Sequence, residues 1–286
     1  METKTKQLPT IGADAVLPAC EIISPSVARV RLNGVWHTVS RLTADGGSNV
    51  KLRKNATTAY DTLGLSLSPA KIGGYEVCPS ASPACRAACL NECGNGYSLD
   101  NVQTGRLARK LLFFQERQWF LERLNRELWF YSQKSEFAGR KLAARLNVFS
   151  DIPWESFGIV DAFPNIQFYD YTKRLNRVGR VRPNYWVTAS RSETNELECL
   201  EILGRGDNVA IAFADLEKER VTNKSQFQRL PKRWNGFRVI DGDKTDLRFT
   251  DPRGGIVVGL RLKAPTKAKR RAAIASGFAV AFGGSK

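Results

Sequence analysis

The pattern of apolar and polar residues near the start of the chain predicts a β-hairpin. Branched and aromatic residues recur over residues 27–39, on both sides of Asn33 and Gly34, a dipeptide that suits the tight turn between two antiparallel strands. We therefore expect residues 1–60 to form a β-rich N-terminal extension. His37, the single histidine of the chain, falls in the second strand of the hairpin, where a structural role is favoured over a catalytic one.

From residue 61 onward the pattern changes to short apolar strands that alternate with helical segments. Residues 61–68 predict a buried strand, and residues 101–137 carry leucine and phenylalanine at helical spacing. Further strands are predicted at residues 144–150, 166–171, 185–189, 208–213, 237–240 and 256–260, and further helices at 192–204 and 224–230. Such alternation is typical of a parallel sheet whose strands are joined by right-handed crossovers.

The fold class that follows from this order is α/β. Six or seven strands at this spacing, with no G-x-G-x-x-G motif after a strand, favour a complete or partial TIM-like (β/α) barrel over a dinucleotide-binding sheet. We expect residues 61–286 to form one barrel-like catalytic domain. Its cysteine-rich loop, residues 78–93, follows the first barrel strand, and its C-terminal tail is basic.

No segment of the chain is expected to cross a membrane. None of its apolar runs approaches the roughly 20 residues that a membrane helix needs. The first ten residues are polar and lack the apolar stretch of a secretory signal. We therefore expect a cytoplasmic protein.

The charge of the chain points to a class of partner. Lysine and arginine together number 44 against 28 aspartates and glutamates, which gives a net charge of +16. A positive field of this size attracts polyanions and speeds their encounter with the protein. Nucleic acid is therefore favoured over the alternative of a basic protein without a polyanionic partner.

The cysteines indicate a metal centre. Four of the six fall within 16 residues, at Cys78, Cys85, Cys89 and Cys93, with the spacing C-x6-C-x3-C-x3-C. Clustered thiols in a reducing compartment favour metal ligation over disulfides, and four thiolates suit either a structural zinc or an iron–sulfur cluster. The spacing matches neither a zinc ribbon nor the C-x3-C-x2-C motif of radical S-adenosylmethionine enzymes, so both metals stay open.

Polar residues follow four of the predicted strands at their carboxyl ends, where barrels carry their working face. They are Ser150 and Asp151; Asp170, Tyr171 and Lys173; Ser190, Arg191 and Glu193; and Asp241, Asp243 and Asp246. One such residue is easily explained as a helix cap, but four strand ends in succession are harder to explain in that way. Because the chain has one histidine, proton transfer would depend on carboxylates, tyrosines or lysines, and these residues form a candidate acid–base or nucleophile site.

Basic residues in two groups offer contacts to a phosphate backbone. The first group is Arg106, Arg109, Lys110 and Arg117, near the start of the long helical stretch. The second follows the strand at 166–171 and consists of Lys173, Arg174, Arg177, Arg180 and Arg182. A solvated helix face is the alternative explanation of the first group.

Several motifs together resemble one family. The segments CPSASPACRAACLNECGNG, RLNVFSDIPWE, FYDYTKR, SRSETNE and WNGFRVIDGDKTDLRFTDPRGGIVVGLRLK are similar, in this order, to segments of the phage- and plasmid-borne gene-product-88 type proteins. The resemblance runs from about residue 52 to residue 282 and leaves the first 50 residues uncovered. It implies a phage-encoded protein that works in the cytoplasm of an infected bacterial host.

A second resemblance, to the phage DNA-guanine transglycosylases, implies an activity. Those enzymes exchange guanine in DNA for a 7-deazaguanine base, which protects the DNA from restriction. The resemblance implies a TIM-like barrel, a carboxylate nucleophile that attacks C1′ of the nucleotide, and a second carboxylate for proton transfer and base recognition. Asp151, Asp170 and Asp241 are the candidates, with Asp151 and Asp241 favoured.

The remaining residues of the candidate site take their expected roles from their positions at strand ends and in the two basic groups. Substrate binding would fall to Ser150, Tyr171, Lys173, Ser190, Arg191, Glu193 and Asp243, and DNA binding to Arg106, Arg109, Lys110, Arg117 and Arg174. The chain departs from the related tRNA enzymes in its cysteines. Their structural zinc site lies late in the chain and includes a histidine, whereas this cluster comes early and has no histidine nearby.

Two other classes of protein stay in consideration. A cysteine cluster in the loop after the first barrel strand is where radical S-adenosylmethionine enzymes hold their iron–sulfur cluster, so the chain also resembles that group. The other alternative is a non-catalytic DNA-binding protein with a structural metal, in which the carboxylates at the strand ends are helix caps.

Overall fold

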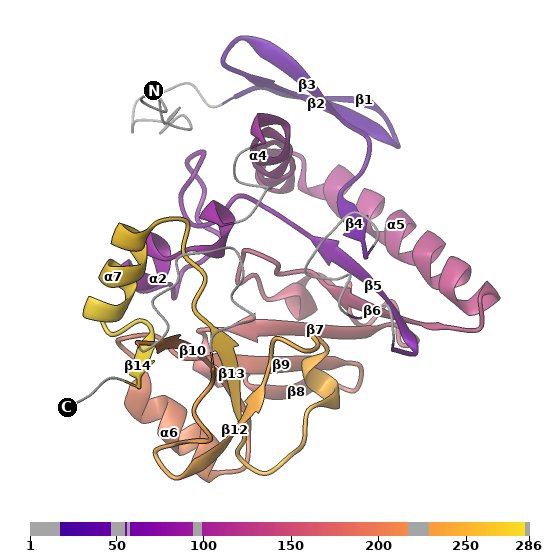
Figure 1. Ribbon diagram of the computed structural model, residues 1–286. Helices are drawn as coiled ribbons and strands as arrows, with labels where there is room; N and C mark the ends of the chain where they lie inside the picture. The colour runs from indigo at the N-terminus through magenta and orange to yellow at the C-terminus, as the bar shows by residue number, and fades with distance from the viewer. Residues whose placement is uncertain (1–17, 47–54, 56–57, 94–98, 217–228, 284–286) are drawn as a thin grey trace.

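The computed structural model describes residues 18–46, 55, 58–93, 99–216 and 229–283 and shows a mixed α/β protein. Figure 1 shows a small antiparallel sheet at the top, long helices beneath it, and a large, mostly parallel sheet below. The cysteine segment and the C-terminal helix α7 (Lys267–Ala275) lie together at one side of the large sheet. None of the described helices is both long and apolar enough to cross a membrane.

The small sheet contains the predicted hairpin. Its strands are β1 (Cys20–Ser24), β2 (Val27–Leu32) and β3 (Val35–Val39). β2 and β3 pair antiparallel around Asn33 and Gly34, whose φ angles of 49° and 82° are both positive, as a type I′ turn requires. The hairpin prediction is therefore confirmed. Ala28 and Val30 are fully buried and belong to the same hydrophobic cluster as Leu107 of the helix below.

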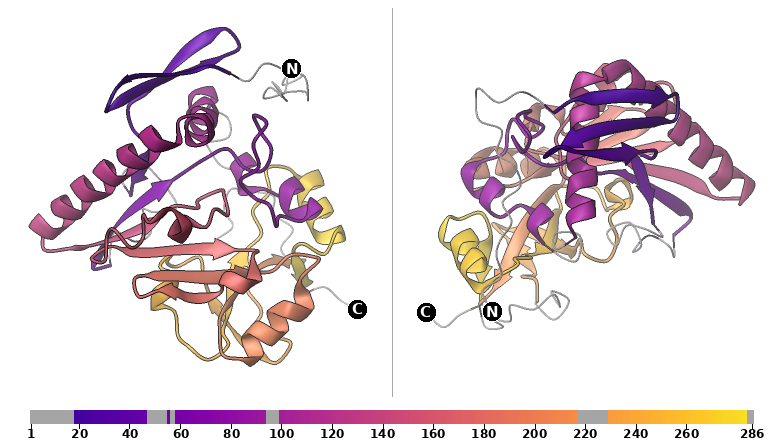
Figure 2. Two further views of the ribbon diagram at one scale, coloured as in Figure 1. Left: turned by 180° about the vertical axis from the view of Figure 1, so that it is seen from behind. Right: turned by 90° about the horizontal axis from the view of Figure 1, so that it is seen from above.

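The long helical stretch forms two helices where its pattern predicts one. α4 (Asp100–Gln115) and α5 (Arg117–Phe137) are separated by Glu116, whose φ and ψ of −122° and 51° leave the helical region. Phe113 and Phe120 are buried on either side of the break, so the apolar spacing gives no sign of it. As a result α4 lies under the small sheet, and α5 runs at an angle to it above the large sheet (Figure 2).

The large sheet is parallel over most of its width. Its strands lie in the order β11–β12–β13–β10–β9–β7–β6–β5–β4, with β8 paired to β9 and β14 paired to β10. Their bounds are β4 (Thr43–Asp45), β5 (Tyr60–Leu65), β6 (Lys141–Arg145), β7 (Gln167–Thr172), β8 (Gly179–Arg182), β9 (Tyr185–Ser190), β10 (Val209–Asp215), β11 (Arg233–Trp234), β12 (Phe237–Asp241), β13 (Val257–Arg261) and β14 (Val280–Phe282). Neighbours from β5 across to β12 run parallel. β4, β8 and β11 are antiparallel to their neighbours.

This sheet confirms the α/β class but is open. Among the described residues the edge strands β4 and β11 do not pair with each other, so the complete TIM-like barrel that the pattern allowed is not found. A closed barrel repeats a strand–helix unit around its axis. Here β7 and β9 are joined through β8 instead, β12 lies outside β13, and short antiparallel strands cover both edges.

Several element boundaries differ from the predicted ones. The strand predicted at 144–150 ends at Arg145, because residues 146–151 form a loop that is hydrogen-bonded around Asn147. The helix predicted at 192–204 begins only at Glu196, as α6 (Glu196–Gly204). Most of the helix predicted at 224–230 lies outside the described residues, and residues 229–230 are not helical.

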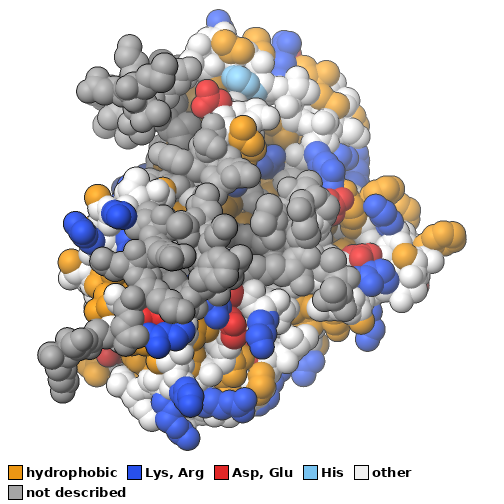
Figure 3. Space-filling view, in the orientation of Figure 1, with side chains coloured by type: hydrophobic (Ala, Val, Ile, Leu, Met, Phe, Trp, Pro, Cys, Tyr) orange, Lys and Arg blue, Asp and Glu red, His pale blue; other side chains and the backbone are white. Residues whose placement is uncertain are grey.

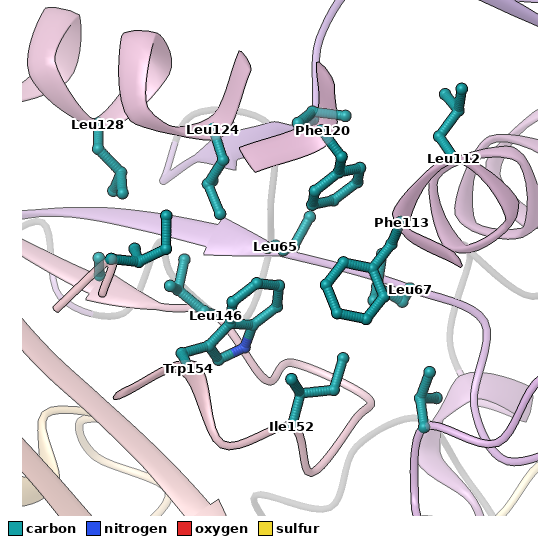
Figure 4. Packing of buried hydrophobic residues seen from close by; sticks show 14 of the residues in the cluster. Leu65, Leu67, Leu112, Phe113, Phe120, Leu124, Leu128, Leu146, Ile152 and Trp154 are labelled. Carbon is teal, nitrogen blue, oxygen red and sulfur yellow. The ribbon is translucent and has the colours of Figure 1, made fainter. Parts of the chain in front are cut away.

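The two long helices and the first strands of the large sheet share one hydrophobic core (Figure 4). Leu65 from β5 and Leu146 after β6 face Leu124 of α5, and the ring of Phe113 lies 5.3 Å from that of Trp154. Each fully buried side chain of this size stabilises the fold by about 1.5–3 kcal/mol relative to exposure. The same cluster includes residues of the small sheet, so the N-terminal extension packs into the core of the larger unit.

Candidate functional site

The carboxyl ends of the parallel strands gather most of the polar residues that the sequence indicated. Ser150 and Asp151 follow β6, Lys173 follows β7, Ser190 ends β9, and Asp241 ends β12. Neighbouring parallel strands end at the same edge of a sheet, and in open α/β sheets that edge is where ligands bind. This edge, called the carboxyl edge below, is therefore the candidate site.

Asp151 joins the ends of β6 and β7. Its Oδ1 accepts hydrogen bonds from the hydroxyl of Thr172 (2.8 Å) and from Nη1 of Arg177 (3.2 Å), and its Oδ2 accepts from the backbone N–H of Lys173 (2.9 Å). Arg177 also holds both carboxylate oxygens of Glu155, at 2.7 and 2.8 Å. Asp151 is 7% exposed, so its oxygens are engaged inside the fold.

Asp170 lies within β7 and is 1% exposed. It accepts hydrogen bonds from the backbone N–H and the side-chain amide of Asn147 (2.8 and 3.0 Å) and from the hydroxyl of Tyr185 (2.8 Å). Burial penalises the ionised carboxylate and raises the pKa of Asp170 to about 7. Asn147 in turn accepts from the Ser150 hydroxyl and the Ile152 N–H. Asp170 therefore fixes the loop that follows β6 from within the core.

Lys173 and Ser190 are in direct contact between β7 and β9. Lys173 Nζ donates to Ser190 Oγ at 2.8 Å and lies 5.8 Å from the ring centre of Phe278. Both residues are half-buried. Arg191, the next residue, is 9% exposed and donates to the carbonyl of Gly277 at 2.7 Å, which ties β9 to the turn after α7. An ammonium beside a hydroxyl can bind the carboxylate or phosphate of a ligand.

Asp241 and Asp243 form an ion-pair cluster at the ends of β12 and β13. Arg261 donates to both oxygens of Asp241 (2.7 and 2.9 Å), and Lys263 Nζ lies 3.1 Å from Asp243 Oδ1. The hydrogen bonds from Arg261 hold the pKa of Asp241 below its ordinary value. The Asp241 side chain is 26% exposed. It is the one candidate catalytic aspartate of the three that reaches the surface.

Tyr171 belongs to a different polar cluster, because successive residues of a strand point to opposite faces of the sheet. Its hydroxyl donates to Asp246 Oδ1 (3.3 Å), and Arg145 Nη1 donates to Asp246 Oδ2 (2.8 Å). The Arg145 guanidinium lies 4.6 Å from the Tyr171 ring centre, and the fully buried Arg248 pairs with Asp251 nearby (3.3 Å). Burial raises the pKa of Asp251 to about 6. Tyr171 and Asp246 thus stabilise the interior.

The cysteine segment lies across the carboxyl edge and is anchored at both of its ends. Cys78 Sγ donates to the Phe149 carbonyl after β6 (3.3 Å), and Cys93 Sγ donates to the Lys263 carbonyl after β13 (3.6 Å). Burial raises the pKa of the Cys78 thiol to about 12, consistent with its role as a hydrogen-bond donor.

Glu193 anchors the middle of the segment to the end of β9. Its carboxylate accepts from the Ser82 hydroxyl (2.7 Å) and from the N–H of Ala84 (3.0 Å), at the start of α2 (Pro83–Ala87). The spacing of Cys85, Cys89 and Cys93 predicts one helical face, but α2 ends at Ala87 because a short 3₁₀ turn, η1 (Leu90–Glu92), follows Cys89. Only Cys85 of the three lies in a helix.

The thiols suit a metal centre in their chemistry but do not converge on one point. Cys78 is near enough to Cys85 and Cys89 for their charges to interact, and none of the six cysteines forms a disulfide. Zinc needs its thiolates at about 2.3 Å from the ion, and in the described part of the chain no three His, Cys, Asp or Glu side chains are placed to hold one ion. In its chemistry, a donor set made only of thiolates suits either a structural zinc or an iron–sulfur cluster.

Two of the basic residues that were expected to contact phosphate point into the molecule. Lys110 is fully buried, and its Nζ donates to the carbonyls of Ala70 and Ile72 (2.5 and 2.7 Å). Arg109 is half-buried and donates to the carbonyl of Ser66 (3.2 Å). Both hold the chain between β5 and the cysteine segment, which is not a surface that a polyanion can reach.

Arg106 lies on the same side of α4 and grips the cysteine segment itself. Its Nη1 donates to Oδ1 of Asn91 (2.7 Å), the residue midway between Cys89 and Cys93. Its guanidinium also lies 4.4 Å from the ring centre of Phe149. Asn91 is held from the other side by Gln103 of α4 (3.1 Å). The first turns of α4 therefore support the cysteine segment.

The other basic residues occupy varied places. Arg117 is half-buried and stacks on the ring of Phe113 at 3.8 Å, while Arg174 is half-buried after β7. Figure 3 shows basic side chains over the lower part of the face seen in Figure 1. Exposed basic residues of the described part include Arg180, Arg205, Lys232, Arg233, Arg238, Arg253, Lys267 and Arg271.

Comparison with known proteins places the chain in a family. The family model of Gene product 88 matches residues 39–280, from the end of the hairpin to the start of the last strand. The chain belongs to the Gene product 88 family. No curated protein and no solved structure matches it. The match begins earlier than the resemblance in the motifs, so part of the N-terminal extension belongs to the family region.

Some residues that build the site of this family member were not recognised from the sequence. Arg145, Asn147 and Arg248 are all less than 9% exposed and bind the polar groups described above. Arg145 and Asn147 lie on either side of Leu146, in a stretch that was expected to be a buried strand. Polar residues at alternate positions of a buried strand indicate that they bind other polar groups inside the protein. Arg248 and Asp251 are three residues apart in the chain, a spacing that suits a local ion pair.

Proposed function

We propose that this protein is an iron–sulfur enzyme of the radical S-adenosylmethionine type that acts on nucleic acid. The position of the cysteine segment carries the proposal. Cys85, Cys89 and Cys93 follow β5, the first parallel strand, and their segment is anchored across the ends of β6, β9 and β13. Radical S-adenosylmethionine enzymes hold their cluster in the corresponding loop.

The order of strands in the large sheet also supports an enzyme of the radical S-adenosylmethionine type. From β5 to β10 the parallel strands follow one another in sequence order, as they do in a partial (β/α) barrel, and we infer that the sheet is one. The spacing C-x3-C-x3-C is one residue longer than the usual motif of that group. The extra residue falls in η1, where Asn91 is held by Arg106 and Gln103.

The proposed roles divide between the cluster and the chain. When bound, a cluster of this type would supply the electron for the reductive cleavage of S-adenosylmethionine. The ammonium of Lys173 and the hydroxyl of Ser190 can bind the carboxylate of that cofactor or a phosphate of the substrate. The ionised and partly exposed Asp241 can accept hydrogen bonds from ligand hydroxyl or amino groups. Glu193 keeps the cysteine segment on β9.

The charge of the protein supports nucleic acid as the proposed substrate. We propose DNA as the form that it prefers. The net charge of +16 favours polyanions, and exposed arginines and lysines are distributed over the described surface. Because Arg109 and Lys110 point inward, phosphate contacts would come from residues such as Arg233 and Arg238 of β11 and β12.

The activity is tested with anaerobically reconstituted protein, S-adenosylmethionine and dithionite. We expect formation of 5′-deoxyadenosine and methionine, detected by chromatography. The triple variant Cys85→Ser/Cys89→Ser/Cys93→Ser should form neither product, whereas Cys199→Ser, which alters a buried cysteine of α6, should retain the activity. A wild-type protein that holds iron and sulfide but forms no 5′-deoxyadenosine would contradict the proposed cofactor.

Asp241 favours a second candidate, the exchange of guanine in DNA for a 7-deazaguanine base. Such an enzyme needs an ionised carboxylate that can reach C1′ of a nucleotide. Asp151 and Asp170 are held by internal hydrogen bonds, but Asp241 is ionised and partly exposed at the carboxyl edge. Incorporation of a labelled base into DNA by wild-type protein, and its loss in Asp241→Asn, would support this candidate. Exchange that persists in Asp241→Asn would rule out the assigned nucleophile.

A further inference from the structure

Two exposed arginines stand directly opposite each other on the hairpin of β11 and β12. Arg233 pairs with Arg238 in the antiparallel register of the two strands, and both side chains are exposed. Like charges that face each other across two strands destabilise the pairing. Among the described residues neither arginine makes a salt bridge, and Arg233 donates to the Gly236 carbonyl (2.6 Å). The fold therefore keeps two cations side by side although their repulsion lowers its stability.

Two further exposed arginines meet at the ring of Trp186, near the start of β9. The Arg253 guanidinium lies 3.5 Å from the centre of this ring, and Arg180 of β8 pairs with Trp186 across the strands. The charge of Arg253 also interacts with that of Asp251, whose carboxylate lies 3.3 Å from Arg248. In the described part of the chain Arg180 makes its side-chain hydrogen bonds to a backbone carbonyl.

These arginines and the hairpin form one surface. Gly255, in the loop that carries Arg253, packs against the ring of Phe237 at the start of β12. Lys232 is exposed beside the arginine pair of the hairpin. The surface, called the basic amino edge below, consists of Arg180, Lys232, Arg233, Arg238 and Arg253.

The basic amino edge lies at the opposite ends of the strands from the candidate site. Arg238 is the second residue of β12 and Asp241 is the last, so about 10 Å of strand separates them at about 3.3 Å per residue. Arg253 precedes β13, which begins at Val257. Figure 3 shows basic side chains gathered at the lower end of the molecule, where Figure 1 places β12. A ligand bound here would leave the carboxyl edge uncovered.

The chemistry of this surface suits the phosphates of a duplex. Phosphate contacts from lysine and arginine position a protein on nucleic acid without reading its sequence. Single strands are usually held by bases that stack on exposed aromatic rings. The exposed tryptophans and phenylalanines of the described residues lie elsewhere, on β3 and α5. A net charge of +16 opposes association with a second copy and favours a polyanion.

We propose that the basic amino edge anchors double-stranded DNA through its phosphates, apart from the candidate site and without regard to base sequence. The inference rests on the nucleic-acid part of the proposed function and does not depend on the metal. Each phosphate that the protein neutralises releases counterions, so the logarithm of the binding constant falls with the logarithm of the salt concentration by about 0.9 per contact. The arginine pair is the centre of this anchor.

The experiment measures fluorescence anisotropy of two short labelled DNA duplexes of unrelated sequence at a series of salt concentrations. We expect the two duplexes to bind the wild-type protein with similar affinity. The variant Arg233→Gln/Arg238→Gln should bind more weakly at low salt, and its salt slope should be smaller by about two, one for each lost phosphate contact. Arg233→Lys/Arg238→Lys keeps both charges and should keep most of the slope.

The matched control removes the same amount of charge from another part of the surface. Arg31→Gln/Arg126→Gln alters exposed arginines of β2 and α5, and Arg31 donates to the Gly34 carbonyl in its own hairpin turn as Arg233 does to Gly236. The control should keep the salt slope of wild type. Thermal unfolding is measured on every variant, and Arg233→Gln/Arg238→Gln should unfold at no lower temperature than wild type, because a like-charge pair is removed.

The outcomes separate the two proposals. Wild-type protein that binds neither duplex at low salt, or that binds vesicles of anionic lipid and not DNA, overturns the nucleic-acid part of the proposed function together with this inference. Duplex binding with the same salt slope in Arg233→Gln/Arg238→Gln as in the control overturns the inference alone. Tighter binding of a single strand than of its duplex overturns the assignment to double-stranded DNA. If the lysine variant binds as weakly as the glutamine variant, the role of charge is overturned.

Discussion

The three aspartates that the sequence offered as catalytic residues differ in what surrounds their carboxylates. Asp151 and Asp170 each accept three hydrogen bonds within the fold, whereas Asp241 is paired with Arg261 near the surface. The sequence could place all three at or near strand ends, because apolar runs mark the strands. It could not rank them, because burial depends on which loops and strands come together.

Asp170 is expected to make stability depend on pH. Its pKa is raised to about 7 in the folded protein, against roughly 3.9 in an unfolded chain. Between these values the folded state keeps a proton that the unfolded state has released, so the free energy of unfolding decreases as pH rises from about 4 to about 7. Asp170→Asn should flatten this decrease, leaving the smaller contribution of Asp251. Urea denaturation at about pH 5 and about pH 8 measures the effect.

The control for this prediction is Asp161→Asn. Asp161 is largely exposed and pairs only with the exposed Arg182 in the contacts described. The free energy of unfolding of the Asp161→Asn variant should depend on pH in the same way as that of wild type. An Asp170→Asn variant whose unfolding free energy falls with pH as steeply as that of wild type would show that Asp170 is ionised in the fold throughout this range.

At the scale of elements, helices are held to strands by single carboxylates. Glu127 of α5 is 5% exposed and accepts from the backbone N–H groups of Leu42 and Thr43 (2.8 Å each), at the outer edge of the sheet. Glu127→Gln places an amide donor against one of these N–H groups. We expect a loss of about 1–3 kcal/mol in the free energy of unfolding, measured by urea denaturation.

Glu122→Gln is the matched control for that measurement. Glu122 is exposed on the same helix and accepts only from Gln118 in the contacts described. Its substitution should change the free energy of unfolding by less than about 0.5 kcal/mol. Equal effects of the two substitutions would mean that Glu127 does not hold β4 to α5.

Glu193 holds the cysteine segment to a strand in the way that Glu127 holds α5. Its bonds to Ser82 and Ala84 hold α2 on the end of β9. Glu193→Ala should lower the iron retained per chain, while a lost helix cap costs only about 1 kcal/mol of stability. Glu198→Ala, on the exposed side of α6, should retain the iron of wild type. Iron retention in Glu193→Ala equal to that of the control would contradict this positioning role.

The periodicity of apolar residues predicted the helices and strands better than the points at which they begin, break and end. The hairpin at Asn33 and Gly34 was predicted because its turn needs particular residues, and it is confirmed. The break at Glu116 was missed because apolar spacing continues across it. Arg106 and Lys110 were grouped near the start of the long helical stretch, but the sequence does not say which side of a helix meets the core. The structure turns the side of α4 that carries them toward the cysteine segment.

At the scale of the whole molecule, the order of strands was predictable and the closure of the sheet was not. Alternating strands and helices predicted a parallel sheet, and the strands from β5 to β10 follow their sequence order. Closure depends on the last strands, where β12 lies outside β13 and is covered by β11. No local pattern encodes that exchange, because it depends on which of the two distant strands pairs with β10.

The carboxyl edge is where the candidate functional groups of the molecule meet. It brings together a cysteine segment that follows the first parallel strand, cations of α4 that hold this segment, and a polar pair at Lys173 and Ser190. A zinc ion and an iron–sulfur cluster would both carry net negative charge when bound by four thiolates, so the nearby cations do not distinguish the two metals. The identity of the metal is therefore the central question.

Metal and sulfide analysis of the anaerobically purified protein, with its visible spectrum, tests this most directly. We expect iron and acid-labile sulfide together, with a broad thiolate-to-iron absorption that disappears in Cys85→Ser/Cys89→Ser/Cys93→Ser and persists in Cys199→Ser. About one equivalent of zinc per chain, with no sulfide and no visible absorption, would contradict it.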